Sequence, residues 1–570
     1  MRVLGISAFH RDSAAALVVD GRLVCAAREE RFTRKLGDGG FPWRSARSCL
    51  QRERIHARDL DRVVFYEKPL RKFERLLASQ LRAFPRSAGP FARTMFLWLG
   101  DRLWTKNRIA SMLEVDPERI AFVHHQAAHA ASAYFPSPFE HAAVLTLDDG
   151  GEWATASLAS GKGSTIETLS ELHHPHSLGL FSQAIAQFLG FEPAADQNKL
   201  EDLAGLGRPR FEREMNELVR ADGDGSFSVD SSCFRFHFDS VRLFDERLSE
   251  LLGPARVPGS VLRMAAPDTR DADVAASLQA VLEERALDLC RALIEREPCE
   301  NLCFAGSLAH NRSLNARILR DGPFERLFVP PWPGEDGAAI GAALLVAHSR
   351  SSPPSSGAYS GYAFPGEGID DPGADAAPRL EAGQAALELA RRLLAGQCVA
   401  WVRGRMELGS ESLGHRSLLA DPRAPDAGAR LLGSVQRSEP YLTARLLVPE
   451  DRAAEFFDLP PGAAWPLRFA QLRVPATAAT RHFAPGAVRA DGTARPQVVH
   501  AGEDPELHRL LTAFGAEAGA PLVMHATFKL RGMPMVRTRT DALEAFGRSA
   551  LDCLVVEDRL YEPGANDGGA

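Results

Sequence analysis

Two histidines four residues apart are the first candidates for chemistry in this sequence. His125 and His129 stand in the stretch HHQAAHAASAY, among small residues. Residues four apart lie on one face of a helix, so both imidazoles can reach a single ion. Gln126 stands where glutamate would follow the first histidine, which excludes the HExxH arrangement of metalloproteases. Taken alone, such a pair is more often part of an ordinary helix than a metal site.

Two acidic turns could complete a metal site with these histidines. Asp148 ends the strand-like run VLTLD before a glycine turn, and Glu335 and Asp336 occupy a second glycine turn, PPWPGEDGAA. Two imidazoles with one or two carboxylates suit a divalent ion such as iron, manganese or zinc. The alternative is that the acids only cap turns or helices.

A third turn, AGSLAHN at residues 305–311, follows a predicted strand and opens a predicted helix. The free N–H groups of such a turn could hold a phosphate. A tight strand–helix connection explains the same residues equally well.

The elements that must position these residues indicate a duplicated α/β architecture. Residues 2–8 are a predicted strand, and residues 14–27 are a predicted hairpin with an Asp-Gly turn. Residues 142–171 repeat this order, with a strand, an acidic glycine turn and two further strands. A largely helical stretch, 44–135, lies between the two meanders. The pattern favours an actin-like fold, which places a phosphate or metal site between its halves.

The length and one biased segment predict the domain organisation. The chain has 570 residues, too many for one compact core. Residues 351–377 are rich in Pro, Gly and Ser and form the predicted linker. We therefore expect a first domain at 1–350, with the metal site and a helical insert, and a second α/β domain at 378–563.

The composition limits the partners of the protein. The formal net charge is −7, and no basic stripe indicates a nucleic-acid groove. No apolar window is long enough for a membrane span. The 8 cysteines are scattered without a CxxC, which fits a reducing compartment. We expect a cytoplasmic protein that binds neither nucleic acid nor membrane.

Seven motifs in the same order along nearly the whole chain resemble the O-carbamoyltransferases of the NodU/CmcH family. They are EERFTRK, HAASAY, SLGLFSQAIAQFLGF, AGSLAHN, GAAIGAAL, GRMELG and LGHRSLLADPR. The resemblance implies a C-terminal YrdC-like domain that joins carbamoyl phosphate and ATP into carbamoyl adenylate. It implies an N-terminal actin-like (ASKHA) domain with a divalent metal, which passes the carbamoyl group to a hydroxyl of a small acceptor in secondary metabolism, such as antibiotic biosynthesis.

The resemblance also assigns site residues in the N-terminal domain. It implies metal ligands at His125, His129, Asp148 and Glu335, with Asp336 as the fallback for the last. The implied nucleotide-side residues are Lys199, Gly306 and Asn311.

The expected catalytic base departs from the family pattern. The family usually has His-Asp before its Ser-Ala-Ala run, whereas this chain reads HRDSAAA, with Arg11 in the histidine's place. Arginine stays charged and cannot accept a proton. His10 sits one residue early, and only a local bulge or turn would direct it to the site. His10 or Asp12 is therefore the predicted base.

The expected donor site departs further. Glu411 stands where an arginine would face phosphate, and glutamate there repels a dianion. A family lysine and a family arginine fall on Gln436 and Leu442. The family's NTSFN motif becomes HATFK, with His525 first. The residues expected to bind carbamoyl phosphate are Arg416, Arg495, Thr527 and Lys529, and Arg531 is a further new cation.

Three hypotheses follow. The chain could be an active carbamoyltransferase in which Lys529 or Arg531 compensates for the lost cations. It could be an enzyme with a changed donor or reaction, or it could be a non-catalytic relative that binds a nucleotide, a metabolite or a partner enzyme. The complete His-His-Asp set disfavours a wholly inactive protein, and the lost phosphate-facing cations disfavour ordinary donor chemistry.

Overall fold

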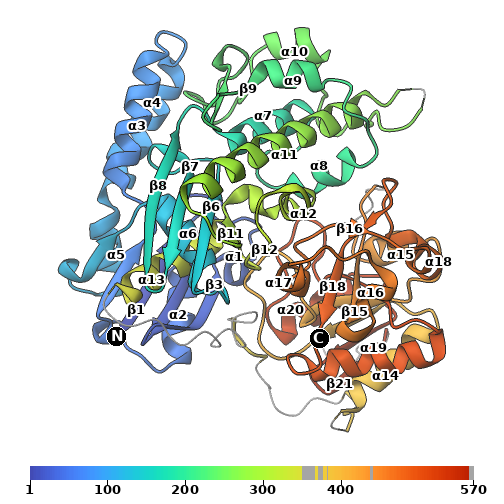
Figure 1. The fold of residues 1–570 in the computed structure, drawn as a ribbon. Coiled ribbons are helices and arrows are strands. Elements are labelled where there is room, and N and C mark those ends of the chain that lie inside the picture. Colours follow the sequence, from blue (N-terminus) through green and yellow to red (C-terminus); the bar gives the residue numbers. More distant parts are fainter. Residues whose placement is uncertain (267, 350–365, 370–376, 382, 437–440, 564–570) are drawn as a thin grey trace. The chain divides into compact units, whose positions relative to one another are not determined.

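A computed structural model describes residues 1–570 except 267, 350–365, 370–376, 382, 437–440 and 564–570. The chain forms two compact units (Figure 1). Unit 1 comprises Met1–Glu29 and Gly39–Tyr359, and unit 2 comprises Glu30–Asp38 and Ser360–Ala570. Most of the predicted linker lies outside the described residues. Nothing in the sequence pattern indicated that Glu30–Asp38 belongs to unit 2.

Unit 1 contains two five-stranded sheets with matching topology. The first has the order β3-β2-β1-β4-β5 and the second the order β12-β11-β6-β7-β8. In each sheet the central strand pairs antiparallel with the strand that follows it and parallel with a later strand. The predicted α/β class and the predicted duplication are confirmed. The strands are β1 (Arg2–Ser7), β2 (Ala14–Val19), β3 (Arg22–Arg28), β4 (Arg62–Phe65), β5 (Ile120–Phe122), β6 (His141–Leu147), β7 (Ala154–Lys162), β8 (Thr165–His173), β11 (Asn301–Ala305) and β12 (Arg326–Phe328), with a separate hairpin of β9 (Val219–Ala221) and β10 (Phe227–Val229).

The helices of unit 1 are labelled in Figure 1. They are α2 (Trp43–Arg52), α3 (Pro69–Arg82), α4 (Ala88–Gly100), α5 (Thr105–Leu113), α6 (His125–Tyr134), α7 (Leu178–Phe188), α8 (Gln197–Ala204), α9 (Glu212–Leu218), α10 (Arg247–Leu252), α11 (Arg270–Arg296), α12 (Arg312–Asp321) and α13 (Glu335–His348). Two of these helices, α6 and α13, pack against each other and against strands of different sheets. The predicted hairpin turns at Asp20 and Gly21, which both have positive φ. The predicted helical stretch also contains the short strands β4 and β5, which are too brief to show an alternating pattern.

The close packing of α6 against α13 brings the candidate ligands together. A Cβ atom added at Gly341 would lie 1.8 Å from the carbonyl oxygen of Ala128, so only glycine permits this approach. The small residues of GAAIGAAL and HAASAY are therefore explained by the crossing of the two helices. The crossing places the first turn of α6 near the first residue of α13.

Unit 2 is built on a seven-stranded mixed sheet of order β18-β15-β19-β14-β13-β20-β21. Its strands are β13 (Val399–Val402), β14 (Arg416–Ala420), β15 (Arg445–Pro449), β18 (Pro496–Val499), β19 (Val523–Thr527), β20 (Cys553–Val556) and β21 (Arg559–Tyr561), beside the small pair β16 (Val474–Pro475) and β17 (Thr493–Ala494). Its helices are α1 (Glu30–Thr33), α14 (Gln384–Leu394), α15 (Ala427–Gly433), α16 (Ala453–Phe456), α17 (Ala464–Arg468), α18 (Ala478–Phe483), α19 (Pro505–Ala518) and α20 (Arg539–Gly547).

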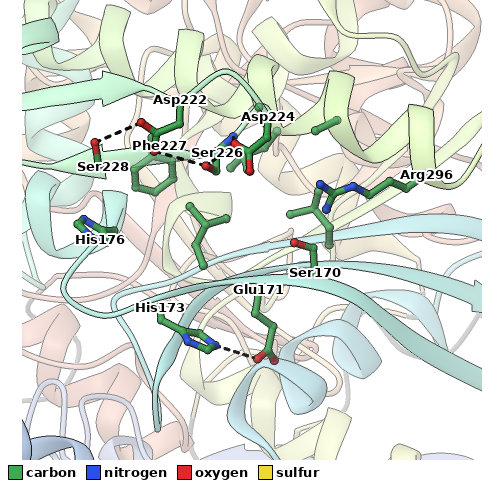
Figure 2. Close-up of a pocket in the computed structure, with 15 residues that line it drawn as sticks. Ser170, Glu171, His173, His176, Asp222, Asp224, Ser226, Phe227, Ser228 and Arg296 are labelled. Atoms are coloured by element: carbon green, nitrogen blue, oxygen red, sulfur yellow. Dashed lines mark hydrogen bonds and ion pairs between the residues drawn. The ribbon is translucent and has the colours of Figure 1, made fainter.

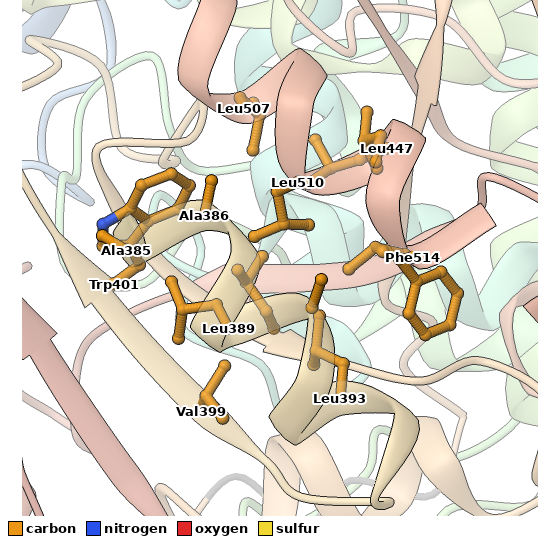
Figure 3. Close-up of a cluster of buried hydrophobic side chains, with 14 of the residues drawn as sticks. Ala385, Ala386, Leu389, Leu393, Val399, Trp401, Leu447, Leu507, Leu510 and Phe514 are labelled. Carbon is orange, nitrogen blue, oxygen red and sulfur yellow. The ribbon is translucent and has the colours of Figure 1, made fainter. Parts of the chain in front are cut away.

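Helices α14 and α19 cover one face of this sheet (Figure 3). Leu389 and Leu510 come from the helices, and Val399 and Trp401 come from β13; all four are buried in one apolar cluster. Burial of apolar side chains is the main favourable term in folding, and this cluster anchors the sheet. Within the described part of the chain, no helix is both long and apolar enough to cross a membrane.

Candidate metal centre and anion cluster

Four predicted ligands converge in unit 1. His125 and His129 lie on α6, Asp148 follows β6, and Glu335 begins α13. One ligand atom from each of the four residues lies within 4.8 Å of the others. Nε2 of His125 is 2.8 Å from Oδ2 of Asp148 and 3.8 Å from Oε1 of Glu335. Nε2 of His129 is 3.8 Å from Oδ2 of Asp148. Two imidazoles and two carboxylates are a donor set that suits a divalent transition metal.

Several polar atoms of this cluster are buried and have no hydrogen-bond partner within the described part of the chain. They include Nε2 of His129 and Oε2 of Glu335. Buried polar atoms in folded proteins are almost always paired, so orphaned ligand atoms fit a bound cation. Burial and the charge on His125 lower the pKa of His129 to about 4. Burial and the neighbouring Asp148 raise the pKa of Glu335 to about 8.

The turn after β11 orients Asp148. The backbone N–H of Ser307 donates to Oδ1 of Asp148 at 2.8 Å, and the Ser307 hydroxyl donates to Asp149. Gly306 makes this approach possible: its φ is +99°, and a Cβ atom there would lie 2.2 Å from the carbonyl oxygen of Leu147. The turn predicted to hold phosphate therefore holds a carboxylate of the cluster.

The structure distinguishes Glu335 from its fallback. Asp336 is buried, accepts a hydrogen bond from Gly337 N–H at 2.9 Å, and lies 3.9 Å from Nε of Arg28. The Asp336 carboxylate thus contacts the first turn of α13 and the guanidinium of Arg28. Glu335 is the acid of this turn that joins the two histidines.

The loop before β2 makes the turn that His10 requires. Phe9 and Asp12 both have positive φ, and the Phe9 N–H donates to the carbonyl of Gly39. Nδ1 of His10 lies 3.4 Å from Oε1 of Glu335, and its side chain is 36% exposed. Asp12 instead forms an ion pair with the buried guanidinium of Arg28. Arg11 lies 3.7 Å from Asp12. Of the two predicted bases, His10 is the one beside the cluster.

The other nucleotide-side predictions have local partners. Asn311 is the N-cap of α12: its Oδ1 accepts from Leu314 N–H at 2.9 Å, and its Nδ2 donates to Gln279. Lys199 on α8 forms an ion pair with Asp196 at 3.2 Å. These contacts assign Asn311 a capping role and leave nucleotide binding by either residue as a prediction.

A separate pocket of about 250 Å³ lies between β8, the β9–β10 hairpin and α11 (Figure 2). His173 pairs with Glu171 at its edge, and Asp222 accepts hydrogen bonds from Ser226 and Ser228. None of the residues predicted from the sequence lines this pocket.

In unit 2, polar side chains occupy the end of the sheet face that α14 and α19 cover elsewhere. Arg445 of β15 stands directly opposite His525 of β19, and Thr527 stands opposite Ser417 of β14. Opposed residues of antiparallel strands share a face, so these side chains form one row. Arg495 precedes β18 at the edge of the sheet. The sequence did not predict this row of side chains, because only the pairing of the strands brings its members together.

Glu411 lies against the two arginines of this row. Its Oε2 accepts from Nη2 of Arg495 at 2.7 Å and lies 3.5 Å from Nη1 of Arg445. Arg445 also donates to the Ser412 carbonyl at 2.7 Å and to the Thr527 hydroxyl at 3.3 Å. We call Glu411, Ser412, Arg445, Arg495, His525 and Thr527 the anion cluster.

The family resemblance did not identify Arg445 as a site residue. The resemblance placed a lost family arginine at Leu442 and a lost family lysine at Gln436. The guanidinium of Arg445, three residues after Leu442, nevertheless lies in the anion cluster. The sequence signal was an arginine at the start of an apolar strand, RLLVP. Lys529 is half-buried just after β19, and Arg531 is exposed.

Phosphate binding by Arg416 stays a prediction, and the structure gives its guanidinium backbone partners. Its guanidinium is fully buried and donates to the carbonyl oxygens of Arg403, Gly404 and Arg537. Burial lowers the pKa of Arg416 to about 10. Its Nη1 and Nη2 groups therefore already have backbone acceptors.

Two family models match this chain. The model described as Carbamoyltransferase N-terminus matches residues 2–344, and the one described as Carbamoyltransferase C-terminus matches residues 390–562. Together they cover most of both units.

Curated relatives agree with this family assignment. An uncharacterized protein of Synechocystis is 35% identical over 98% of this chain and 96% of its own length. The nodulation protein NolNO of Sinorhizobium fredii is 31% identical over 97% of this chain and 79% of its own. The 3'-hydroxymethylcephem-O-carbamoyltransferase of Amycolatopsis lactamdurans is 29% identical over 53% of this chain and 56% of its own. Among solved structures, HypF of T. kodakarensis aligns with a TM-score of 0.31, at 14% identity, over 61% of this chain and 47% of its own.

Proposed function

The chain belongs to the carbamoyltransferase family, and from this premise we propose that it moves a carbamoyl group from an activated donor to a hydroxyl of a small acceptor molecule. Carbamoyl phosphate, activated with ATP as carbamoyl adenylate, is the first candidate for the donor. Natural-product or other secondary metabolism is the proposed setting. The observation that carries the proposal is the convergence of His125, His129, Asp148 and Glu335.

The four ligands would hold one divalent ion. Their orphaned nitrogen and oxygen atoms are buried and face one another, which fits a cation better than a structural hydrogen-bond network. When bound, such an ion supplies Lewis-acid polarisation of a carbonyl or phosphoryl oxygen. The N–H of Ser307 keeps the Asp148 carboxylate in place for this role.

The chain supplies a base beside these ligands. The partly exposed ring of His10 lies next to Glu335, where an acceptor hydroxyl can approach it from solvent. The hydroxyl oxygen forms a bond to the carbamoyl carbon, the bond from that carbon to the phosphate oxygen breaks, and AMP leaves. His10 receives the hydroxyl proton. Asp12 is held by Arg28 and is the weaker candidate for this step.

The direct test uses ATP, carbamoyl phosphate labelled on carbon, and a set of hydroxylated acceptors that includes amino sugars and polyketides. We expect pyrophosphate release and transfer of label to an acceptor. His10→Ala should lower transfer and leave pyrophosphate release unchanged, because the two steps use different units. Transfer that is unaffected by loss of both His125 and His129 would contradict the proposed role of the metal centre.

A second candidate keeps the scaffold but changes the donor, or retains only binding. The observation that favours it is the ion pair between Glu411 and Arg495, since a carboxylate already stands beside the cations that would meet phosphate. Nucleotide binding without pyrophosphate release from ATP and carbamoyl phosphate would support this candidate over the first.

A further inference from the structure

We propose that Glu411 is a built-in competitor for oxyanions at the anion cluster: its carboxylate stands where a ligand's phosphate or carboxylate would pair with Arg445 and Arg495, and it selects against dianions. The inference rests on the proposed function only for the role of unit 2 in donor binding. It concerns the charge that this site accepts, which neither the family models nor the relatives assign.

The geometry of the ion pairs carries the first part of the argument. The side chains of Arg445 and Arg495 are only 4% and 6% exposed, whereas that of Glu411 is 21% exposed. The carboxylate therefore lies on the solvent side of two buried guanidiniums. Because buried guanidiniums need anionic or carbonyl partners, an entering oxyanion and Glu411 compete for the same donors.

The unpaired ring nitrogens of His525 indicate that a ligand could complete the anion cluster. His525 is fully buried, and neither of its ring nitrogens has a hydrogen-bond partner among the residues that the structure describes. Its strand register places it on the same face as Arg445 and Thr527. An imidazole with no protein partner at the edge of two arginines fits a site that is completed by a ligand.

Arg445, Glu411 and Arg495 are the charged side chains of the anion cluster, and all three act electrostatically on His525. The Glu411 carboxylate repels any entering anion, and it repels a dianion about twice as strongly as a monoanion because the Coulomb energy is proportional to the ligand's charge. Like charges in a partly buried site repel strongly, so a dianion must displace the carboxylate. The two methylene groups of Glu411 and its partial exposure permit that movement.

The test compares anion binding to the full-length wild type and to Glu411→Gln, an isosteric change that removes the charge. Inorganic phosphate at pH 8 serves as the dianion and bicarbonate as the monoanion, each measured by calorimetric titration. We expect Glu411→Gln to tighten phosphate binding at least 10-fold and to change bicarbonate binding much less. Glu388→Gln is the matched control, because it removes a carboxylate paired with Arg391 and Arg392 elsewhere in unit 2.

Equal phosphate affinity in the wild type and in Glu411→Gln would overturn the inference, as would the absence of phosphate binding by both. Circular dichroism checks folding, and Glu411→Ala provides a second uncharged variant. Anion binding can be measured without catalytic turnover. The inference about Glu411 and the proposed carbamoyl transfer can therefore be refuted independently. Pyrophosphate release with no effect of Glu411→Gln on phosphate binding removes only this inference. A 10-fold effect without turnover of any acceptor removes only the proposed function.

Discussion

Nε2 of His125 lies 2.8 Å from Oδ2 of Asp148, while the second oxygen of that carboxylate accepts the backbone N–H of Ser307 at 2.8 Å. The aspartate is thus fixed from two sides, by a helix and by a glycine turn. Burial lowers the pKa of His125, but Glu335 and Asp148 outweigh this effect and raise that pKa to about 9. Without an ion, a proton on His125 takes the place that a cation would fill.

The first prediction concerns metal content. His129→Ala should reduce bound divalent metal from about one ion per chain to below one tenth, because it removes one of four ligands. Elemental analysis of the purified protein measures this. His124→Ala is the control, since His124 neighbours the pair but contacts Lys68 instead. Equal metal in both variants would refute the assignment of ligands.

Gly306 should tolerate no side chain. Alanine there would force a Cβ atom to 2.2 Å from the Leu147 carbonyl, so we expect a loss of more than about 2 kcal/mol in the free energy of unfolding, together with weaker metal binding. Gly163→Ala is the control: it also has positive φ but open space, and should cost only about 1 kcal/mol. Denaturant titration of both variants decides whether the clash matters.

Arg416→Lys should destabilise unit 2 without changing donor affinity in the molecules that remain folded. Lysine cannot pair with the same carbonyl oxygens of Arg403, Gly404 and Arg537, and each unpaired buried carbonyl costs about 1–3 kcal/mol. Thermal unfolding and donor titration separate the two effects. If Arg416→Lys lost donor binding but kept the thermal stability of the wild type, Arg416 would be a ligand-binding residue.

Acid should destabilise unit 2 through His525. Burial, and then the charge of Arg445, hold the pKa of His525 well below 6.5 in the folded protein. Below pH 6.5 the unfolded chain therefore binds a proton that the folded chain does not, and stability falls as the pH falls, by at most about 1.4 kcal/mol per pH unit. His525→Leu should remove this part of the pH dependence. Identical pH profiles of the unfolding midpoint in wild type and variant would disprove it.

The convergence of His125, His129, Asp148 and Glu335 was predictable because its signals are local. The HxxxH spacing, an aspartate at the end of a strand and an acidic turn before a small-residue helix each have a local meaning, and the topology of the sheets brings them together. The duplication of the α/β unit was also predictable from the sequence, because both hairpins repeat the same order of strands and turns.

The anion cluster was less predictable because its members meet only through strand pairing. Arg445 belongs to the site by its register opposite His525, which no sequence spacing reveals. Arg416 illustrates the reverse case, since an arginine predicted to bind phosphate donates to backbone carbonyls, a set of contacts that no sequence motif reveals. The approach of His10 to Glu335 depended on positive φ at Phe9 and Asp12, where neither residue is glycine.

The central claim is that His125, His129, Asp148 and Glu335 form the metal centre of a carbamoyl-transferring enzyme. Its most direct test is label transfer from carbon-labelled carbamoyl phosphate, with ATP, to a hydroxylated acceptor before and after metal removal by a chelator. We expect transfer to stop on chelation, to return when iron, manganese or zinc is restored, and not to return in His129→Ala. Undiminished transfer by the metal-stripped protein would contradict the claim.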